Sequence, residues 1–147
     1  MRLRTKCIVL LILVTSSFHL SGFSAQVVAI SDGDTLTVLE DRQQLKIRLA
    51  NIDAPEKAQP FGQKSKESLS DLCYRKDTSY QTQDVDKYGR MVAVVTCGGV
   101  EANREQVRRG FAWIYQKYNR DPSLLPLEQE AKENRALVEP ETDRQSV

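Results

Sequence analysis

The spacing of the apolar residues changes once along this chain, and that change limits the possible folds more than any other feature. QVVAIS (26–31) is a short apolar segment, and apolar and polar residues alternate in TLTVLE (35–40) and QQLKIRLANI (43–52). Alternation of this kind is typical of half-buried β-strands, and the DGD between the first two segments is typical of a tight turn. We therefore predict a three-stranded meander in the first third of the chain.

Beyond Pro60 the apolar residues recur at helical spacing. Leu69, Leu72 and Cys73 share one face of a helix predicted over residues 62–74. The later elements predicted are strands over 77–85 and 90–97, a short helix ended by Gly110, and a last helix over 123–138 with Pro126 in or near its first turn. Five strands and about three helices predict an α+β fold, a small β-barrel with helices packed on it.

The first residues differ in kind from the rest of the chain. Arg2, Arg4 and Lys6 precede the apolar run 7–14, and small residues follow it. This is the layout of a secretory signal peptide, which we assign to residues 1–25. A membrane anchor is the alternative, but the apolar run is shorter than the roughly 20 residues that span a bilayer.

The leader defines the remaining domain boundaries. We expect cleavage between Gly22 and Ala25. Phe23 fits poorly three residues before a cut after Ala25, so a cut after Ser24 is an equal alternative. The folded domain is then expected over 26–138 and a disordered charged tail over 139–147. The product is expected to be secreted or periplasmic, without stable membrane association.

Removal of the leader also restricts the chemistry. The remaining chain has 18 Lys+Arg and 20 Asp+Glu, a net charge of −2, so it has no general attraction for nucleic acid. His19, the only histidine, leaves with the leader, which excludes histidine-dependent triads and histidine-ligated zinc. Proton transfer is left to carboxylate, tyrosine or lysine, and oxygen ligands favour calcium or magnesium.

Two cysteines, Cys73 and Cys97, follow the leader. An even pair in an exported protein is usually oxidised, so we expect a Cys73–Cys97 disulfide. Two buried free thiols are the alternative.

Four motifs occur in a fixed order along the chain. They are DGDTLTV (32–38), IRLANIDAPE (47–56), DKYGR (86–90) and N-x-x-x-V-x-x-G-x-A (103–112). Together they resemble the staphylococcal-nuclease-like family, also called thermonucleases, over about residues 26–135. The resemblance implies an OB-type five-stranded barrel with three helices, which agrees with the elements predicted above.

The resemblance also implies a calcium site. Asp34 and Asp53 match the two aspartates that bind calcium in the family, and the backbone carbonyl of Ala54 matches a third ligand. Calcium takes six to eight oxygen ligands, so water and a substrate phosphate would complete the set. Simple turn aspartates are the alternative for both residues.

Three further charged residues match the family's catalytic set. Arg48 and Arg90 match two arginines that clamp phosphate, for which a planar guanidinium is well suited. Glu56 matches the candidate general base for the attacking water, which it either deprotonates or orients. Surface ion pairs are the alternative for the arginines, and a solvent-facing glutamate is the alternative for Glu56.

The implied function is calcium-dependent hydrolysis of phosphodiester bonds in DNA and RNA, with little sequence specificity and with 3′-phosphate products. Tyr88, Tyr115 and Tyr118 are candidates for stacking on bases, with ordinary packing as an equal alternative. We expect a monomer. The rival hypotheses are a catalytically inactive OB-fold nucleic-acid-binding module and a secreted OB-fold binder of another ligand.

One departure from the family lies at the end of the chain. Many relatives end the last helix with Gly-Leu-Trp, whereas this chain has only Leu137 and Val138 to fill that place. The departure concerns stability more than chemistry.

Overall fold

The computed structural model describes residues 25–134. Its elements are β1 (Ala25–Ile30), β2 (Thr35–Glu40), β3 (Gln43–Leu49), β4 (Ile52–Asp53), α1 (Gly62–Cys73), β5 (Asp77–Val85), β6 (Met91–Cys97), β7 (Val100–Glu101), α2 (Ala102–Arg108), β8 (Trp113–Ile114), the 3₁₀ helix η1 (Pro122–Leu124) and α3 (Leu125–Glu133). The predicted leader, apart from Ala25, and the predicted tail lie outside these residues. The last helix, predicted over 123–138, instead begins as the 3₁₀ helix η1, and α3 ends at Glu133 with Asn134 as its C-cap.

Five strands close into a barrel, as predicted. Strands β1, β2 and β3 form the antiparallel meander, β5 joins β1, and β6 joins β5. Parallel pairing of β3 with β6, which sets Arg48 opposite Val92, closes the ring. Closure leaves few unpaired strand edges, and the short β7 adds to β6 outside the ring.

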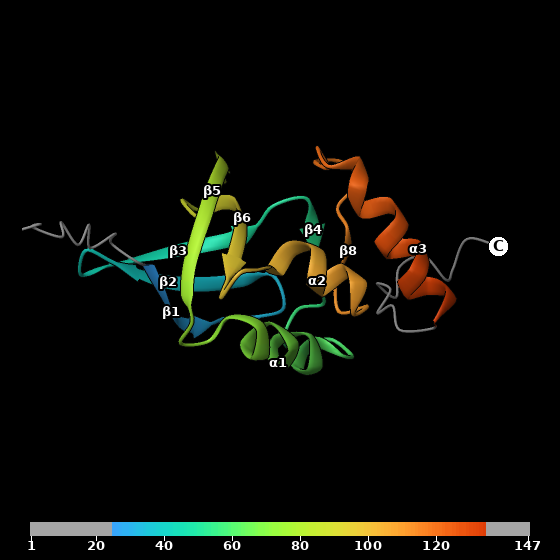
Figure 1. Cartoon of the computed structure of the whole chain (residues 1–147), viewed down its shortest axis with the longest axis horizontal. Coiled ribbons are helices and arrows are strands. Elements are labelled where there is room, and N and C mark those ends of the chain that lie inside the picture. The colour runs from blue at the N-terminus through green and yellow to red at the C-terminus, as the bar shows by residue number, and fades with distance from the viewer. Residues whose placement is uncertain (1–24, 135–147) are drawn as a thin grey trace, which may run out of the picture.

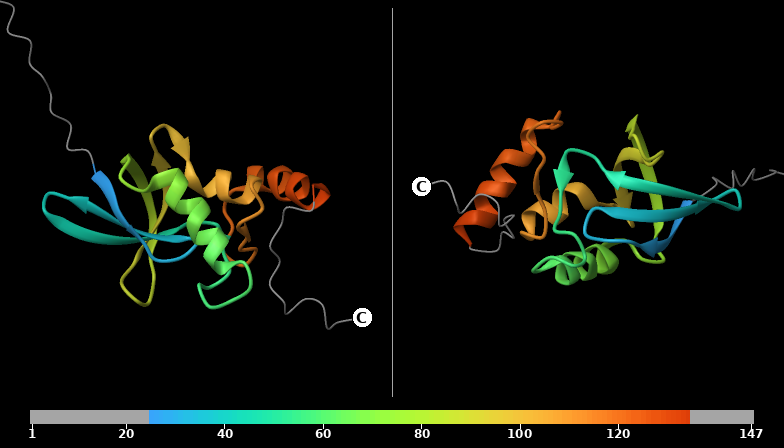
Figure 2. Two further views of the ribbon diagram at one scale, coloured as in Figure 1. Left: turned by 90° about the horizontal axis from the view of Figure 1, so that it is seen from below. Right: turned by 180° about the vertical axis from the view of Figure 1, so that it is seen from behind.

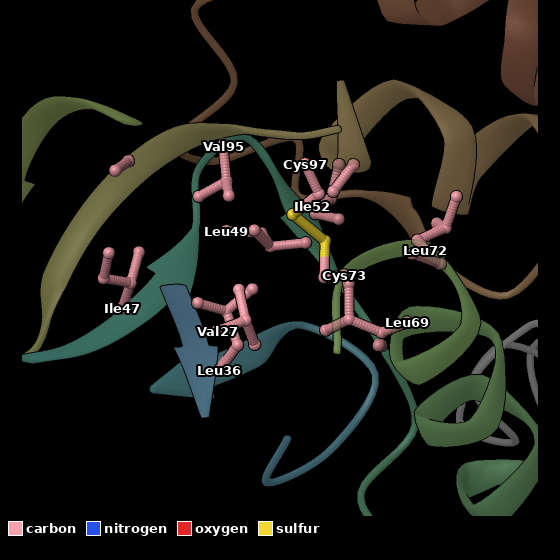
Figure 3. Packing of buried hydrophobic residues seen from close by; sticks show 14 of the residues in the cluster. Val27, Leu36, Ile47, Leu49, Ile52, Leu69, Leu72, Cys73, Val95 and Cys97 are labelled. Atoms are coloured by element: carbon pink, nitrogen blue, oxygen red, sulfur yellow. A yellow bond between two sulfur atoms is a disulfide. The ribbon is translucent and has the colours of Figure 1, made fainter. Parts of the chain in front are cut away.

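The core fills the barrel and extends to one face of α1. Figure 3 shows the aliphatic side chains of the strands pointing toward one another, with Leu69 and Leu72 of α1 beside them. Ile47, Leu49 and Leu69 are fully buried. Each such side chain contributes roughly 1.5–3 kcal/mol relative to an exposed position. The period-two and helical patterns of the sequence therefore identified the inward faces correctly.

The helices lie around one end of the barrel. Figures 1 and 2 place α3 and the β2–β3 turn at opposite ends of the molecule. Helix α2 lies between α1 and α3 and also contacts β6. No helix within residues 25–134 has the length and apolar character needed to cross a bilayer.

The strands missed by the sequence analysis have only two residues each. Strand β4 pairs with β8, with Ile52 opposite Ile114 and Asp53 opposite Trp113. The strand predicted over 43–52 ends at Leu49, because the chain turns at Asn51, and Ile52 belongs to β4 instead. Strand β8 has two residues, which are too few for a periodic pattern. This small pair holds Asp53 at the end of the barrel near α2.

The structure contains a disulfide between Cys73, at the end of α1, and Cys97, at the end of β6. The two Cα atoms are 5.1 Å apart, and both side chains are buried. The bridge, drawn in yellow in Figure 3, ties the first helix to the barrel.

We predict that this bridge is formed in the purified, leader-free protein. Thiol titration after unfolding without reductant should then find no reactive thiol, and two thiols per chain would contradict the prediction. Reduction should lower the free energy of unfolding by about 3 kcal/mol, because the bridge restricts the segment between Cys73 and Cys97 in the unfolded chain. Denaturant unfolding with and without reductant measures the difference.

Candidate active site

Asp34 lies in a tight loop between β1 and β2. The Ser31 N–H donates to the Thr35 carbonyl at 2.8 Å, and the Leu49 N–H donates to the Asp34 carbonyl at 2.7 Å. The Thr35 hydroxyl donates to Asp34 Oδ1 at 2.8 Å. These contacts hold a buried carboxylate, only 6% exposed, beside the end of β3.

Asp53 reaches the same place through a sharp reversal after β3. Asn51 has a positive φ of 68°, a conformation that asparagine tolerates better than most residues. The Asn103 side-chain amide donates to the Ala50 carbonyl at 2.9 Å, and the Tyr115 N–H donates to the Asn51 carbonyl at 2.9 Å. The reversal returns Asp53 toward Arg48.

Arg48 joins the two aspartates. Its Nη2 atom lies 3.2 Å from Asp34 Oδ2 and 2.8 Å from Asp53 Oδ1. Its Cζ atom also lies 5.5 Å from the centre of the Tyr115 ring. Side chains from three separate segments therefore meet at one guanidinium group.

The Asp34 carboxyl group is costly to ionise in this cluster. Burial raises the pKa of Asp34 to about 8, nearby Arg48 opposes this shift, and Asp32 adds to it. The attraction of Arg48 therefore does not offset the cost of burying the Asp34 charge. A cation bound between Asp34 and Asp53 would favour the ionised form.

The available donors fit a hard divalent cation. Asp34 Oδ2 and Asp53 Oδ1 both contact Arg48 Nη2. Ala54, whose backbone carbonyl is the third predicted ligand, follows Asp53 directly. Oxygen ligands of this kind suit calcium or magnesium. Within residues 25–134 no three His, Cys, Asp or Glu side chains gather closely enough to hold a metal ion. Water and substrate would therefore have to supply the remaining ligands.

Asp86 binds both the backbone and the side chain of Arg90. Oδ2 of Asp86 accepts from Arg90 Nε at 2.6 Å, and its Oδ1 accepts from the Arg90 and Tyr88 N–H groups. Burial opposes ionisation of Asp86, but hydrogen bonds from Arg90 and Tyr88 lower its pKa overall. Arg90 Nη1 lies 3.5 Å from the Thr35 hydroxyl, which in turn contacts Asp34. Both arginines therefore border the Asp34 loop.

Glu56 lies on an exposed turn three residues after Asp53. Its N–H donates to the Gln59 side chain at 2.7 Å, and its carbonyl accepts from the Gln59 N–H at 2.8 Å. The Gly62 N–H then donates to the Gln59 carbonyl at 3.0 Å. The backbone that carries Glu56 is thus tied down, while the side chain faces solvent.

Each predicted tyrosine lies beside a cation. Tyr88 is 72% exposed, and its ring lies 4.9 Å from Lys87 Nζ and 5.6 Å from Arg90 Cζ. Tyr118 packs edge-on against Tyr115 at 5.0 Å between ring centres. The three rings therefore lie next to the charged residues and not in the core.

The greater part of the chain matches a known protein family. The profile of the family described as staphylococcal nuclease homologue matches residues 46–137, more than half of the chain. The chain belongs to the staphylococcal nuclease family. The resemblance seen in the sequence is thereby confirmed.

Individual members of the staphylococcal nuclease family are similar over most of the chain. An uncharacterized endonuclease of Haemophilus influenzae is 44% identical over 126 residues, which cover 85% of this chain and 71% of that protein. A micrococcal nuclease of Shigella flexneri is 37% identical over 135 residues, covering 84% of this chain and 78% of that protein. An uncharacterized endonuclease of Escherichia coli O157:H7 is 40% identical over 111 residues, covering 75% and 72%.

The structure adds supporting residues that sequence reasoning about the staphylococcal nuclease family missed. Asp86 orients Arg90, Thr35 links Arg90 to Asp34, and Gln59 holds the turn of Glu56. An aspartate that opens a turn with glycine three residues later is a recognisable signal, and Asp86 with Gly89 has it. Thr35 and Gln59 carry no comparable signal.

Gly62 leads to a prediction about the same turn. A Cβ atom at Gly62 would lie 1.9 Å from the Glu56 carbonyl oxygen, so Gly62→Ala must displace that backbone. We expect a loss of stability of roughly 1–3 kcal/mol, as for other overpacked sites, and a lower turnover number because Glu56 moves. Thermal unfolding and steady-state cleavage of an oligonucleotide measure both effects.

Gly99→Ala is the matched control for this prediction. Gly99 has a φ of +84°, and a Cβ atom there would meet no other atom within 4 Å, so alanine costs stability through backbone strain alone. Its turnover should stay at the level of the unsubstituted protein. A Gly62→Ala protein with normal turnover would show that the turn does not position Glu56.

Proposed function

We propose that this protein is a calcium-dependent endonuclease that hydrolyses phosphodiester bonds of DNA and RNA with little sequence specificity and leaves 3′-phosphate ends. The observation that carries the proposal is the buried Asp34 carboxylate, which shares Arg48 with Asp53. The endonuclease and nuclease names of the relatives agree with it.

The carboxylates of Asp34 and Asp53 and the carbonyl of Ala54 would hold the calcium ion. When bound, calcium supplies positive charge to a phosphoryl oxygen and makes a nearby water a better nucleophile. The Asp34 carboxylate, whose pKa burial raises, would be easier to keep ionised beside this cation.

Arg48 and Arg90 bind the substrate phosphate in this proposal. Both guanidinium groups border the Asp34 loop, one paired with Asp34 and Asp53 and the other within 3.5 Å of Thr35. A planar guanidinium can hold two phosphoryl oxygens at once and stabilise charge that develops in the transition state. Asp86 keeps the Arg90 side chain in a defined orientation for this contact.

Glu56 is proposed as the general base or as the residue that orients the attacking water. It is exposed, it follows Asp53 by three residues, and its backbone is held by Gln59. As general base, Glu56 would take a proton from the water while the water oxygen forms a bond to phosphorus. The P–O5′ bond then breaks, and the 5′-oxygen takes up a proton from solvent and leaves as a 5′-hydroxyl.

Tyr88, Tyr115 and Tyr118 are proposed to stack on bases. An aromatic ring accepts the face of any base, so stacking gives affinity without sequence readout. The neighbouring Lys87, Lys117 and Arg48 would attract the adjacent phosphates.

Cleavage of plasmid DNA and of RNA, each with calcium, with magnesium or with a chelator, tests this function. Degradation with calcium alone supports it, and 5′-hydroxyl ends that a kinase labels without prior phosphatase treatment identify 3′-phosphate products. A gel shift without cleavage would instead support the inactive binding module. A protein that neither cleaves the nucleic acid nor shifts it in a gel would support a binder of another ligand.

We also propose export to the periplasm or the medium, with cleavage after Ser24. Ala25 is the first residue of β1, pairs with Thr78 and is only 3% exposed, so cleavage after Ala25 would remove a buried strand residue. N-terminal sequencing of the processed protein should begin at Ala25. A sequence that begins at Gln26 would contradict this assignment.

A further inference from the structure

Helix α2 buries a glutamine where an apolar residue is expected. Its buried face consists of Ala102, Asn103, Gln106 and Val107, and Gln106 is fully buried. A buried amide lowers stability unless its donors and acceptor are all paired, so each such group calls for an explanation.

Both amide hydrogens and the amide oxygen of the Gln106 side chain have partners. Nε2 donates to the Gly33 carbonyl at 2.7 Å and to the Ser65 carbonyl at 3.1 Å. Oε1 accepts from the Ser68 hydroxyl at 2.6 Å. One side chain therefore connects α2 with α1 and with the loop before β2.

The loop is packed tightly at this contact. A Cβ atom at Gly33 would lie 1.8 Å from Ser65 Oγ and 2.9 Å from the Cβ of Ala54. The Ser65 hydroxyl is itself held, since it donates to the Phe111 carbonyl at 2.6 Å. Gly33 thus lies directly between α1 and the segment that follows Asp53.

Gly33 and Asp34 are consecutive, and the carbonyl of each has a partner. Gln106 binds the Gly33 carbonyl, and the Leu49 N–H binds the Asp34 carbonyl. The first contact comes from a helix and the second from the end of β3. The two contacts together define the path of the backbone that carries the buried carboxylate.

We propose that Gln106 is a positioning residue for Asp34, holding the loop so that the Asp34 carboxylate faces Arg48 and Asp53. The consequence for calcium binding rests on the proposed function, whereas the consequence for the loop does not. Loss of the amide leaves the buried carbonyls of Gly33 and Ser65 without this donor, which favours movement of the loop.

Gln106→Leu tests the proposal, because leucine is of similar size but forms no hydrogen bond. Val107→Ala is the matched control, since Val107 is fully buried one residue along the same helix but its truncation removes only core volume. Ser68→Ala is a milder second variant that removes one partner of Gln106 and leaves its amide hydrogens in place, in case Gln106→Leu does not fold.

The first readout is amide hydrogen exchange without metal. In Gln106→Leu the amides of Ser31 and Leu49, which bond within or to the Asp34 loop, should exchange at least about tenfold faster relative to those of β5 and β6, the effect of losing about one buried hydrogen bond. Ser68→Ala should show a smaller change at the same amides. In Val107→Ala the loop and the strands should change together. Equal behaviour of the Gln106→Leu and Val107→Ala proteins would overturn the proposal.

The second readout is calorimetric titration with calcium alone at a temperature where every variant is folded. Gln106→Leu should raise the Kd by about tenfold and Val107→Ala should leave it unchanged, because only the former removes a contact to the Gly33 carbonyl. If the unsubstituted protein binds no calcium while the loop amides still exchange faster in Gln106→Leu, that combination would refute the proposed metal and support the positioning role. An unchanged Kd in Gln106→Leu with normal calcium binding would overturn the role of Gln106 toward Asp34.

Discussion

Replacing Glu56 with glutamine is expected to lower the turnover number by roughly 10²–10⁴-fold, the usual contribution of a positioned acid or base. The amide keeps the size of the side chain but cannot accept a proton. Calcium affinity should stay nearly unchanged, because Glu56 is not one of the proposed ligands and does not belong to the cluster of Asp34, Arg48 and Asp53. Steady-state cleavage of a short oligonucleotide at saturating calcium measures the effect.

Glu67→Gln is the control for this substitution. Glu67 lies on the exposed face of α1, where it accepts from the Gln63 side chain, so the same chemical change there should leave turnover unchanged. A Glu56→Gln protein with turnover within about tenfold of normal would remove Glu56 from the chemical step.

Replacing Asp34 with asparagine is expected to separate stability from function. Calcium binding should weaken by at least about 100-fold, since losing even an outer partner of a metal ligand typically costs roughly 10–100-fold. The metal-free protein should nevertheless become more stable, because a neutral amide replaces a buried carboxyl whose pKa burial raises to about 8.

The stability gain should depend on pH in a defined direction. The folded protein binds the Asp34 proton more tightly than the unfolded chain, so stability falls as pH rises from the ordinary value of 3.8 through about 8. The Asp34→Asn substitution removes this dependence, and its advantage should therefore be absent near pH 3 and largest above pH 8. Denaturant unfolding across this range in the presence of a chelator measures it.

Asp53→Asn is the matched control for Asp34→Asn. The Asp53 side chain is 37% exposed, against 8% for Asp34, so its carboxylate is not costly to keep. It should weaken calcium binding without stabilising the metal-free protein. If Asp34→Asn lowers stability at pH 8 and above, burial of the Asp34 charge does not destabilise the metal-free protein.

Most of the barrel was predictable from the sequence because its long strands repeat a period-two pattern. Strands β2, β5 and β6 and helix α1 begin and end within about a residue of their predicted limits. The two-residue strands β4 and β8 were missed because each depends on a partner far along the chain, and β7 was missed because two residues show no periodic pattern. The periodic pattern therefore predicted the long elements, and it did not predict the two-residue strands.

The site was predictable to a lesser depth. The charged residues were predicted because they stand in recognisable motifs, and the structure brings Arg48 into direct contact with Asp34 and Asp53. Gln106 was not found, because it looks like an ordinary helix residue and its partner Gly33 lies 73 positions away. Contacts that position a site depend on tertiary packing, which a single sequence does not display.

The parallel pairing of β3 with β6 also makes the assembled site depend on the closed barrel. Arg48 and Val92 are far apart in the chain, so bringing them together orders a long intervening segment at a cost in conformational entropy. Arg48 and Arg90 therefore come to border one loop only when the ring of strands is complete. Under the proposed export, a chain that leaves the cell unfolded would carry the residues of the proposed site without the site assembled, and it would not attack nucleic acid before it folds.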